Sequence, residues 1–447
     1  MMKRAAYILM LMTVILSCKK EGLTMSYSSA DISGKPEEHM VLAGFAARDG
    51  LSDGIHLPLF THCMVVGDGS QKVCIISNDL MEISPAIADT MLTMISERSG
   101  LPKENILMHC IHTHSAPRSG GASNFTGGTN RAWKDRMVET VVSNAVSTIE
   151  AKGKSFTMEI GKGSSNINGN RCEKTGPVDH SVYVARFLQK GKPVVSIVNY
   201  ACHPVSMGPG SYLLSSDYPG VAARYLQEAW GGEVFQLSGA QGNIDPAEGP
   251  KKVDYTERIG KQLADDIKDM EFSKVQSKGL LRLVNNTVDL PYQIDKVTPE
   301  AVIRHADSLA ASAKTSFPRF AHDVMGWKEE ILERFRAGEV PSKLRYHLHG
   351  VNLDGVVFFF SDGEPFCEYQ MEARDAFPGT TIFFAGYTNG QNSYLPSEHA
   401  YEVRKGYEYE IEQMHVYIKA PYPLSDRMPS VYREGVIDTI RETIDKQ

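Results

Sequence analysis

The chain has 447 residues, of which 42% are hydrophobic and 23% are charged, a composition typical of a globular protein long enough to bury a large core. Its formal net charge of −7 and its pI of about 6.1 argue against nucleic acid as a partner, because nucleic-acid binding needs a basic surface. Beyond the N-terminus, no segment has the length and hydrophobicity of a transmembrane helix.

The N-terminus has the pattern of a secretory signal. Lys3 and Arg4 precede a short apolar run, Ala5 to Leu16, which is followed by Ser17 and Cys18, so residues 1–17 are predicted to be a signal peptide. The sequence ILSC that ends at Cys18 resembles a bacterial lipobox, which implies lipidation of that cysteine; the alternative is an ordinary signal peptide with an incidental cysteine. Residues 18–29 are polar and predict a tether. We therefore expect a cell-envelope lipoprotein of the periplasm or outer membrane, held to the membrane by Cys18.

The rest of the chain alternates apolar strands with amphipathic helices. A proline at the first helical position and a terminal glycine bound the helix from Ser84 to Gly100. The other predicted helices lie within 133–149, 216–229, 251–269 and 298–343, and the predicted strands within 73–76, 106–110, 194–200, 234–237, 280–290, 356–361 and 380–385. This order predicts an α/β layered sandwich around a mostly buried mixed sheet, with one catalytic domain over 30–447.

Polar motifs follow four of the apolar runs, at the strand ends where ligands bind in such folds. These motifs are HTHSAP after 106–110, CHP after 194–200, GEPF after 356–361 and TNGQNSY after 380–385. A glycine-rich turn over 238–246 and a Gly/Ser-rich loop over 119–129, expected at the rim of the site, lie between them.

His112 and His114 are two residues apart, so on an extended segment their side chains point the same way. Together with His203, Glu364 and Tyr394 at the other strand ends, they predict a site of nitrogen and oxygen donors. Such a set suits a catalytic Zn²⁺ that keeps one position open for water. Each residue could instead have a purely structural role. His203 could bond to the backbone at a strand end, Glu364 could be a turn carboxylate, and Tyr394 could be a packing residue.

The motifs HTHSAP, CHPVSM and GEPF, followed by Tyr394 and Tyr407, resemble in order those of the neutral/alkaline non-lysosomal ceramidase family. The segment SADIS at 29–33 and the pair Asn170–Arg171 also match landmarks of that family. The resemblance implies Zn²⁺ ligands at four positions: His112, His203, Glu364 and Tyr394. It implies that His114, Arg171 and Tyr407 line the catalytic pocket, where they position the scissile amide or its oxyanion and His114 moves a proton.

The sequence departs from the family pattern at one position of that pocket. Ceramidases carry a serine in a Gly-Asp-Val-Ser-Pro turn, and here the turn is GNIDP with Asp245 in place of the serine. An ionised carboxylate accepts protons, so we expect Asp245 to act as general base for attack by water; the alternative is a carboxylate that caps its own turn. We also expect the chain to lack the family's C-terminal immunoglobulin-like domain.

The predicted function is therefore zinc-dependent hydrolysis of an N-acyl amide bond by metal-activated water. The substrate would be a ceramide-like lipid or another N-acylated molecule such as an acylated amino sugar. Two alternatives stay open: a zinc hydrolase of this fold that cleaves an ester or glycosidic bond, and a binding lipoprotein with a disused site. Depth and polarity of the pocket would separate lipid from sugar substrates.

Overall fold

The computed structural model describes most of the chain after the signal region. The described residues are 22–45, 48–120, 130–247, 249, 251–316, 318–340, 342–390, 393–403, 414–416 and 418–445. The expected signal peptide, the first four residues of the tether with Cys18, most of the rim loop and Tyr407 lie outside them. Residues 24–29, expected to belong to the tether, instead form part of a β-strand, Thr24–Asp31, because they pair with a neighbouring strand of the first sheet. No described helix has the length and apolar content needed to span a membrane. The lipid anchor therefore stays a prediction.

Strands are divided among three larger sheets, so the α/β class is confirmed while the single expected sheet is replaced by several. The first sheet has the order β5 (Ile106–Cys110), β4 (Lys72–Asn78), β3 (Phe60–Gly67), β1 (Thr24–Asp31) and β6 (Lys154–Ser155). The second has the order β12 (Glu233–Ser238), β10 (Lys192–Tyr200), β9 (Ser181–Gln189), β7 (Thr157–Ser164) and β14 (Phe272–Lys274). The third has β15 (Leu281–Leu290), β16 (Leu344–Leu353), β17 (Val356–Ser361) and β19 (Thr381–Ala385).

Short strand pairs add to these sheets near their ends. They are β11 (Leu213–Leu214) with β2 (Gly54–Ile55), β13 (Ile244–Pro246) with β8 (Asn168–Asn170), and β18 (Glu364–Pro365) with β20 (Tyr394–Leu395). In the last pair Glu364 lies opposite Tyr394 in a parallel register. Two residues that are thirty positions apart in the chain are thereby neighbours in space.

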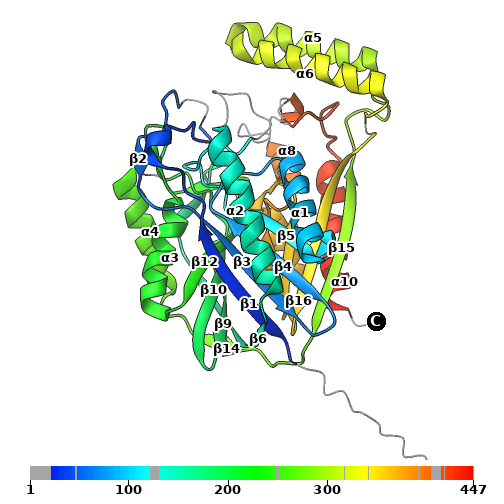
Figure 1. Cartoon of the computed structure of the whole chain (residues 1–447). Helices are drawn as coiled ribbons and strands as arrows, with labels where there is room; N and C mark the ends of the chain where they lie inside the picture. The colour runs from blue at the N-terminus through cyan, green and yellow to red at the C-terminus, as the bar shows by residue number, and fades with distance from the viewer. Residues whose placement is uncertain are drawn as a thin grey trace, which may run out of the picture.

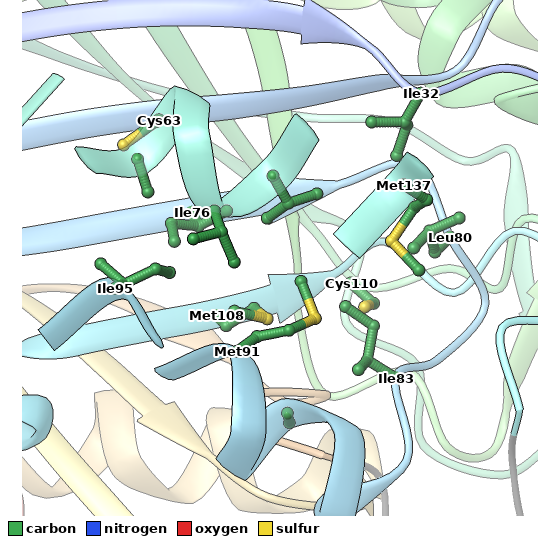
Figure 2. Close-up of a cluster of buried hydrophobic side chains, with 14 of the residues drawn as sticks. Ile32, Cys63, Ile76, Leu80, Ile83, Met91, Ile95, Met108, Cys110 and Met137 are labelled. Carbon is green, nitrogen blue, oxygen red and sulfur yellow. The ribbon is translucent and has the colours of Figure 1, made fainter. Parts of the chain in front are cut away.

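The first sheet packs face to face on the second and third through an apolar layer that includes Met64, Ile75, Phe187, Phe235 and Phe383. Its outer face is covered by α1 (Pro85–Ser99) and α2 (Arg131–Glu150), as Figure 1 shows. Figure 2 shows side chains of both helices meeting those of β4 and β5, with Met91, Ile95 and Met137 packed against Ile76 and Met108. The helix periodicity predicted for these two segments is confirmed, with Gly100 ending α1 in a left-handed conformation at φ 74°.

The other sheets are covered by helices on their far faces. Helices α3 (Asp217–Trp230) and α4 (Val253–Ile267) pack on the second sheet, while α7 (Cys367–Ala376) and α10 (Met428–Ile444) pack on the third. The helical segment predicted within 298–343 is two helices, α5 (Pro299–Ser316) and α6 (Pro318–Ala337), which lie above the sheets in Figure 1. They enclose a small core around Trp327 that also includes Val416 from a later segment. The remaining short helices are η1 (Pro36–Glu38), η2 (Lys103–Asn105) and α8 (Glu398–Val403).

Candidate metal centre

His112 and His114 lie in the turn after β5, which ends at Cys110. The prediction that they lie on an extended segment, with both side chains on one face, was wrong, because His112 has a left-handed backbone with φ 72°. The two rings nevertheless lie 5.0 Å apart, since the turn is held by hydrogen bonds from the His112 amide to the Leu80 carbonyl (2.9 Å) and from the His114 amide to the Pro204 carbonyl (3.1 Å).

The imidazoles of His112 and His203 are oriented by backbone carbonyls. Nδ1 of His112 lies 2.9 Å from the Met81 carbonyl oxygen, and Nδ1 of His203 lies 2.6 Å from that of Gln241. A carbonyl accepts but cannot donate, so Nδ1 carries the proton in both rings. Nε2 of each neutral ring is therefore a lone-pair donor, the tautomer that a metal ligand requires.

Glu364 brings a carboxylate oxygen to both of these nitrogens. Its Oε2 lies 3.4 Å from Nε2 of His112 and 3.2 Å from Nε2 of His203. Neutral rings protonated at Nδ1 cannot donate a hydrogen bond through Nε2, so three lone pairs face one another. Ligands bound tetrahedrally at about 2.0–2.1 Å from Zn²⁺ would be separated by about 3.3 Å. Both distances from Oε2 of Glu364 to the histidine nitrogens agree with that separation. The donor set therefore fits a divalent metal.

Burial keeps the histidines neutral. It lowers the pKa of His112 to about 3, with the positive charge of Arg171 adding to the effect. Burial also holds the pKa of His203 well below its ordinary value, and repulsion from Arg171 acts in the same direction. A neutral imidazole binds a metal at neutral pH without first losing a proton.

His114 is buried beside the other two histidines. One ring nitrogen from each of His112, His114 and His203 lies within 4.8 Å of the others. Neither ring nitrogen of His114 has a hydrogen-bond partner among the described residues. Gly44 admits this ring, because a side chain at that position would overlap it: an added Cβ would lie 2.3 Å from ring atoms. His114 can therefore act either as a base beside the metal donors or as an additional metal ligand.

Arg171, Asp245 and Tyr394 form a connected row beside the histidines. Arg171 donates from Nη1 to Oδ1 of Asp245 at 3.0 Å and from Nη2 to the Tyr394 hydroxyl at 3.2 Å. The other oxygen of Asp245, Oδ2, accepts from Nζ of Lys251 at 3.1 Å. Each oxygen of Asp245 therefore accepts a hydrogen bond from a cation, which orients Arg171. If Asp245 acts as a general base, one of these oxygens must also accept a proton.

Tyr387 is a site residue that the sequence did not reveal. Its hydroxyl donates to Oε2 of Glu364 at 3.3 Å, and its ring lies 4.6 Å from that of His112. The backbone is left-handed, with φ 55°, and its amide and carbonyl bond to Gly363 and Cys110. The only available signal was its place two residues after β19, at the same kind of strand end as the recognised donors.

Comparisons with known proteins relate both the sequence and the fold to ceramidases. Residues 24–244 match the family model described as neutral/alkaline non-lysosomal ceramidase, N-terminal. Neutral ceramidase 2 of Arabidopsis thaliana is 25% identical over 246 residues, which cover 50% of this chain and 32% of the relative. Neutral ceramidase of Oryza sativa subsp. japonica is 24% identical over 250 residues, covering 49% and 31%. The matches thus span about a third of these relatives.

Solved structures share the fold over a longer stretch. A structure titled "Ceramidase complexed with C2" superposes with a TM-score of 0.70 at 15% identity, covering 94% of this chain and 74% of that one. The neutral ceramidase from Pseudomonas aeruginosa superposes with a TM-score of 0.70 at 16% identity, covering 95% and 75%. At such low identity the likeness shows a common fold.

Proposed function

Because the chain belongs to the neutral/alkaline non-lysosomal ceramidase family, we propose that it is a zinc-dependent hydrolase of an N-acyl amide bond. The observation that carries the proposal is the approach of Nε2 of His112 and Nε2 of His203 to the same oxygen, Oε2 of Glu364, at 3.4 and 3.2 Å. Tyr394, opposite Glu364 in the β18–β20 pair, is the proposed fourth ligand. Zinc in such a site lowers the pKa of water to about 7 and polarises a carbonyl.

The residues around the donors would supply the remaining steps. The Arg171 guanidinium, fixed by Asp245 and the Gly242 carbonyl, can donate hydrogen bonds to a carbonyl oxygen as negative charge develops there. Asp245 would accept a proton from the attacking water, and His114 would deliver one to the departing amine nitrogen. Tyr407, outside the described residues, keeps its proposed place in the pocket from the family resemblance alone.

The intact donor set favours an active enzyme over a disused binding site. A buried carboxylate facing two histidine lone pairs destabilises the fold unless a cation or proton lies between them, so a chain that no longer used the site would gain by losing it. The amide is favoured over an ester or glycosidic bond by the family membership of residues 24–244.

Metal analysis and hydrolysis measured together test the proposal. The purified protein should contain about one zinc per chain and release amine from a panel of N-acyl lipids and N-acetyl sugars. His203→Ala should lose zinc and activity together, because removing one of few ligands leaves the ion undercoordinated. His322→Ala, on an exposed histidine of α6, is the matched control and should retain both. A metal-free wild-type protein with full activity would refute the proposal.

A further inference from the structure

We propose that the substrate carries an anionic group next to the scissile amide, such as a carboxylate, sulfonate or phosphate, and that Lys251 recognises it. This inference rests on the proposed function, since it specifies which N-acyl compounds the site accepts. It starts from the row of contacts that runs from Lys251 through Asp245 to Arg171 and on to the Tyr394 hydroxyl. That row places the ammonium of Lys251 at the outer end of the predicted catalytic residues.

The ammonium group of Lys251 has hydrogen-bond donors that the described residues do not use. An ammonium group has three N–H donors. Among the described residues one of them is used, on Oδ2 of Asp245 at 3.1 Å, and the side chain is 35% exposed. Asp245 and Arg171 are 19% and 12% exposed, so exposure increases along the row from Arg171 to Lys251. A ligand approaching from solvent would therefore meet Lys251 first, with two N–H groups free to bind it.

The position of Lys251 beside Asp245 is set by a close approach of the backbone at Gly208. Gly208 has a left-handed φ of 73°, and a Cβ at this position would lie 2.7 Å from the Cβ of Lys251. The Gly208 carbonyl also accepts a hydrogen bond from Nη2 of Arg48 at 3.3 Å. One glycine thus brings the chain bearing Lys251 close to a second, buried cation.

Arg48 adds to an excess of positive charge around His114. Its guanidinium donates to the carbonyls of Ala43, His114 and Gly208, so these described contacts leave its charge without a carboxylate partner. With Arg171 and Lys251, which both contact Asp245, Arg48 makes a group of three cations in this region. These three cations are set against two carboxylates, Asp245 and Glu364, in the contacts described above. A divalent metal would increase the excess further.

Such an excess selects for a negatively charged ligand. A neutral amino-alcohol head group would leave the potential uncompensated, whereas an anion would be attracted to the site and would accept charge-assisted hydrogen bonds from Lys251. The scissile carbonyl would then lie toward Arg171, because Arg171 and Lys251 are joined by the same Asp245 carboxylate. The expected substrates are N-acyl amino acids, or N-acyl compounds in which a sulfonate or phosphate replaces the carboxylate of the amino acid.

The test compares matched substrates that share one acyl chain. An N-acyl amino alcohol supplies the neutral head group, and an N-acyl amino acid and an N-acyl aminosulfonate supply the anionic ones. For zinc-loaded wild type, kcat/KM should be higher on the anionic substrates, and the ratio of anionic to neutral kcat/KM should fall as salt is raised, because a partly exposed contact is screened. Lys251→Gln should lower that ratio about three- to tenfold, the effect of one partly exposed charge-assisted contact.

Control variants separate charge recognition from damage to the fold. Lys251→Arg should restore the ratio, and Lys252→Gln should leave it unchanged, because Lys252 is 60% exposed and lies 3.8 Å from Asp254 instead. A wild-type ratio below one, or an unchanged ratio in Lys251→Gln, would overturn the inference while leaving the hydrolase proposal intact. Failure of zinc-loaded wild type on every N-acyl substrate would overturn both.

Discussion

Tyr387→Phe tests whether the hydroxyl that reaches Glu364 positions a metal ligand. The substitution removes one oxygen atom and keeps the ring, so the contact with His112 at 4.6 Å between ring centroids is preserved. The hydrogen bond to Oε2 of Glu364 is lost. Glu364 then retains its backbone position, set by the bond from its amide to the Ser393 carbonyl at 2.8 Å, but loses a restraint on its carboxylate.

The magnitude follows from the geometry of this bond. Hydrogen bonds to charged groups contribute about 1.5–3 kcal/mol, and at 3.3 Å this one is longer than the usual hydroxyl–carboxylate bond, so the lower end applies. A loss of about 1.4 kcal/mol corresponds to about tenfold in affinity. We therefore expect the zinc dissociation constant of Tyr387→Phe to rise about tenfold, within the range found for outer-shell partners of metal ligands.

Competition with a chromophoric chelator measures this constant directly, and thermal unfolding of the metal-free protein reports the cost to the fold. Tyr369→Phe is the matched control, because Tyr369 is also a buried tyrosine and donates to the Pro396 carbonyl at 2.8 Å, with no contact to the metal donors. The control should lose stability and keep wild-type zinc affinity. Wild-type zinc affinity in Tyr387→Phe would show that the hydroxyl has no part in orienting Glu364.

Two further substitutions address the row beside the metal donors. Arg171→Lys should lower kcat/KM by about a hundredfold, because the guanidinium contacts Asp245, Gly242 and Tyr394 from two separate nitrogens of a planar group, and the single nitrogen of lysine cannot reproduce that geometry. Near-normal turnover would make Arg171 a structural residue. Asp245→Asn should retain zinc and reduce turnover by about a hundredfold or more, the usual cost of losing a general base. The wild-type enzyme should show no burst of amine in pre-steady-state measurements, because direct attack by water forms no covalent acyl-enzyme. Turnover equal to wild type, or a clear burst, would exclude Asp245 as the base.

The sequence predicted secondary structure well where residues such as proline and glycine mark the ends of an element. Helix α1 was bounded correctly because Pro85 can begin a helix and Gly100 can adopt the left-handed conformation that ends one. The segment 298–343 was less well predicted, since composition cannot reveal that α5 and α6 fold back on each other around Trp327. That packing depends on residues such as Val416, far along the chain.

The residues of the site divide in the same way. His112, His203 and Glu364 could be selected because each follows an apolar run, and the structure brings their donor atoms together. Tyr387 and Lys251 could not, because their roles arise from contacts between distant segments. The left-handed backbone of Tyr387, which directs its hydroxyl to Glu364, has no signature in the sequence around a tyrosine.

The strand ends converge because each large sheet contains one parallel pair. Strand β4 is parallel to β5, β10 to β12, and β17 to β19. The carboxyl ends of paired parallel strands lie at the same edge of a sheet, and the first sheet packs on the other two, so these edges meet. His112 follows β5, His203 follows β10, Glu364 follows β17 and Tyr387 follows β19. A polar residue within a few positions of such an end is therefore the one to examine in this fold, even where no histidine or acid marks it.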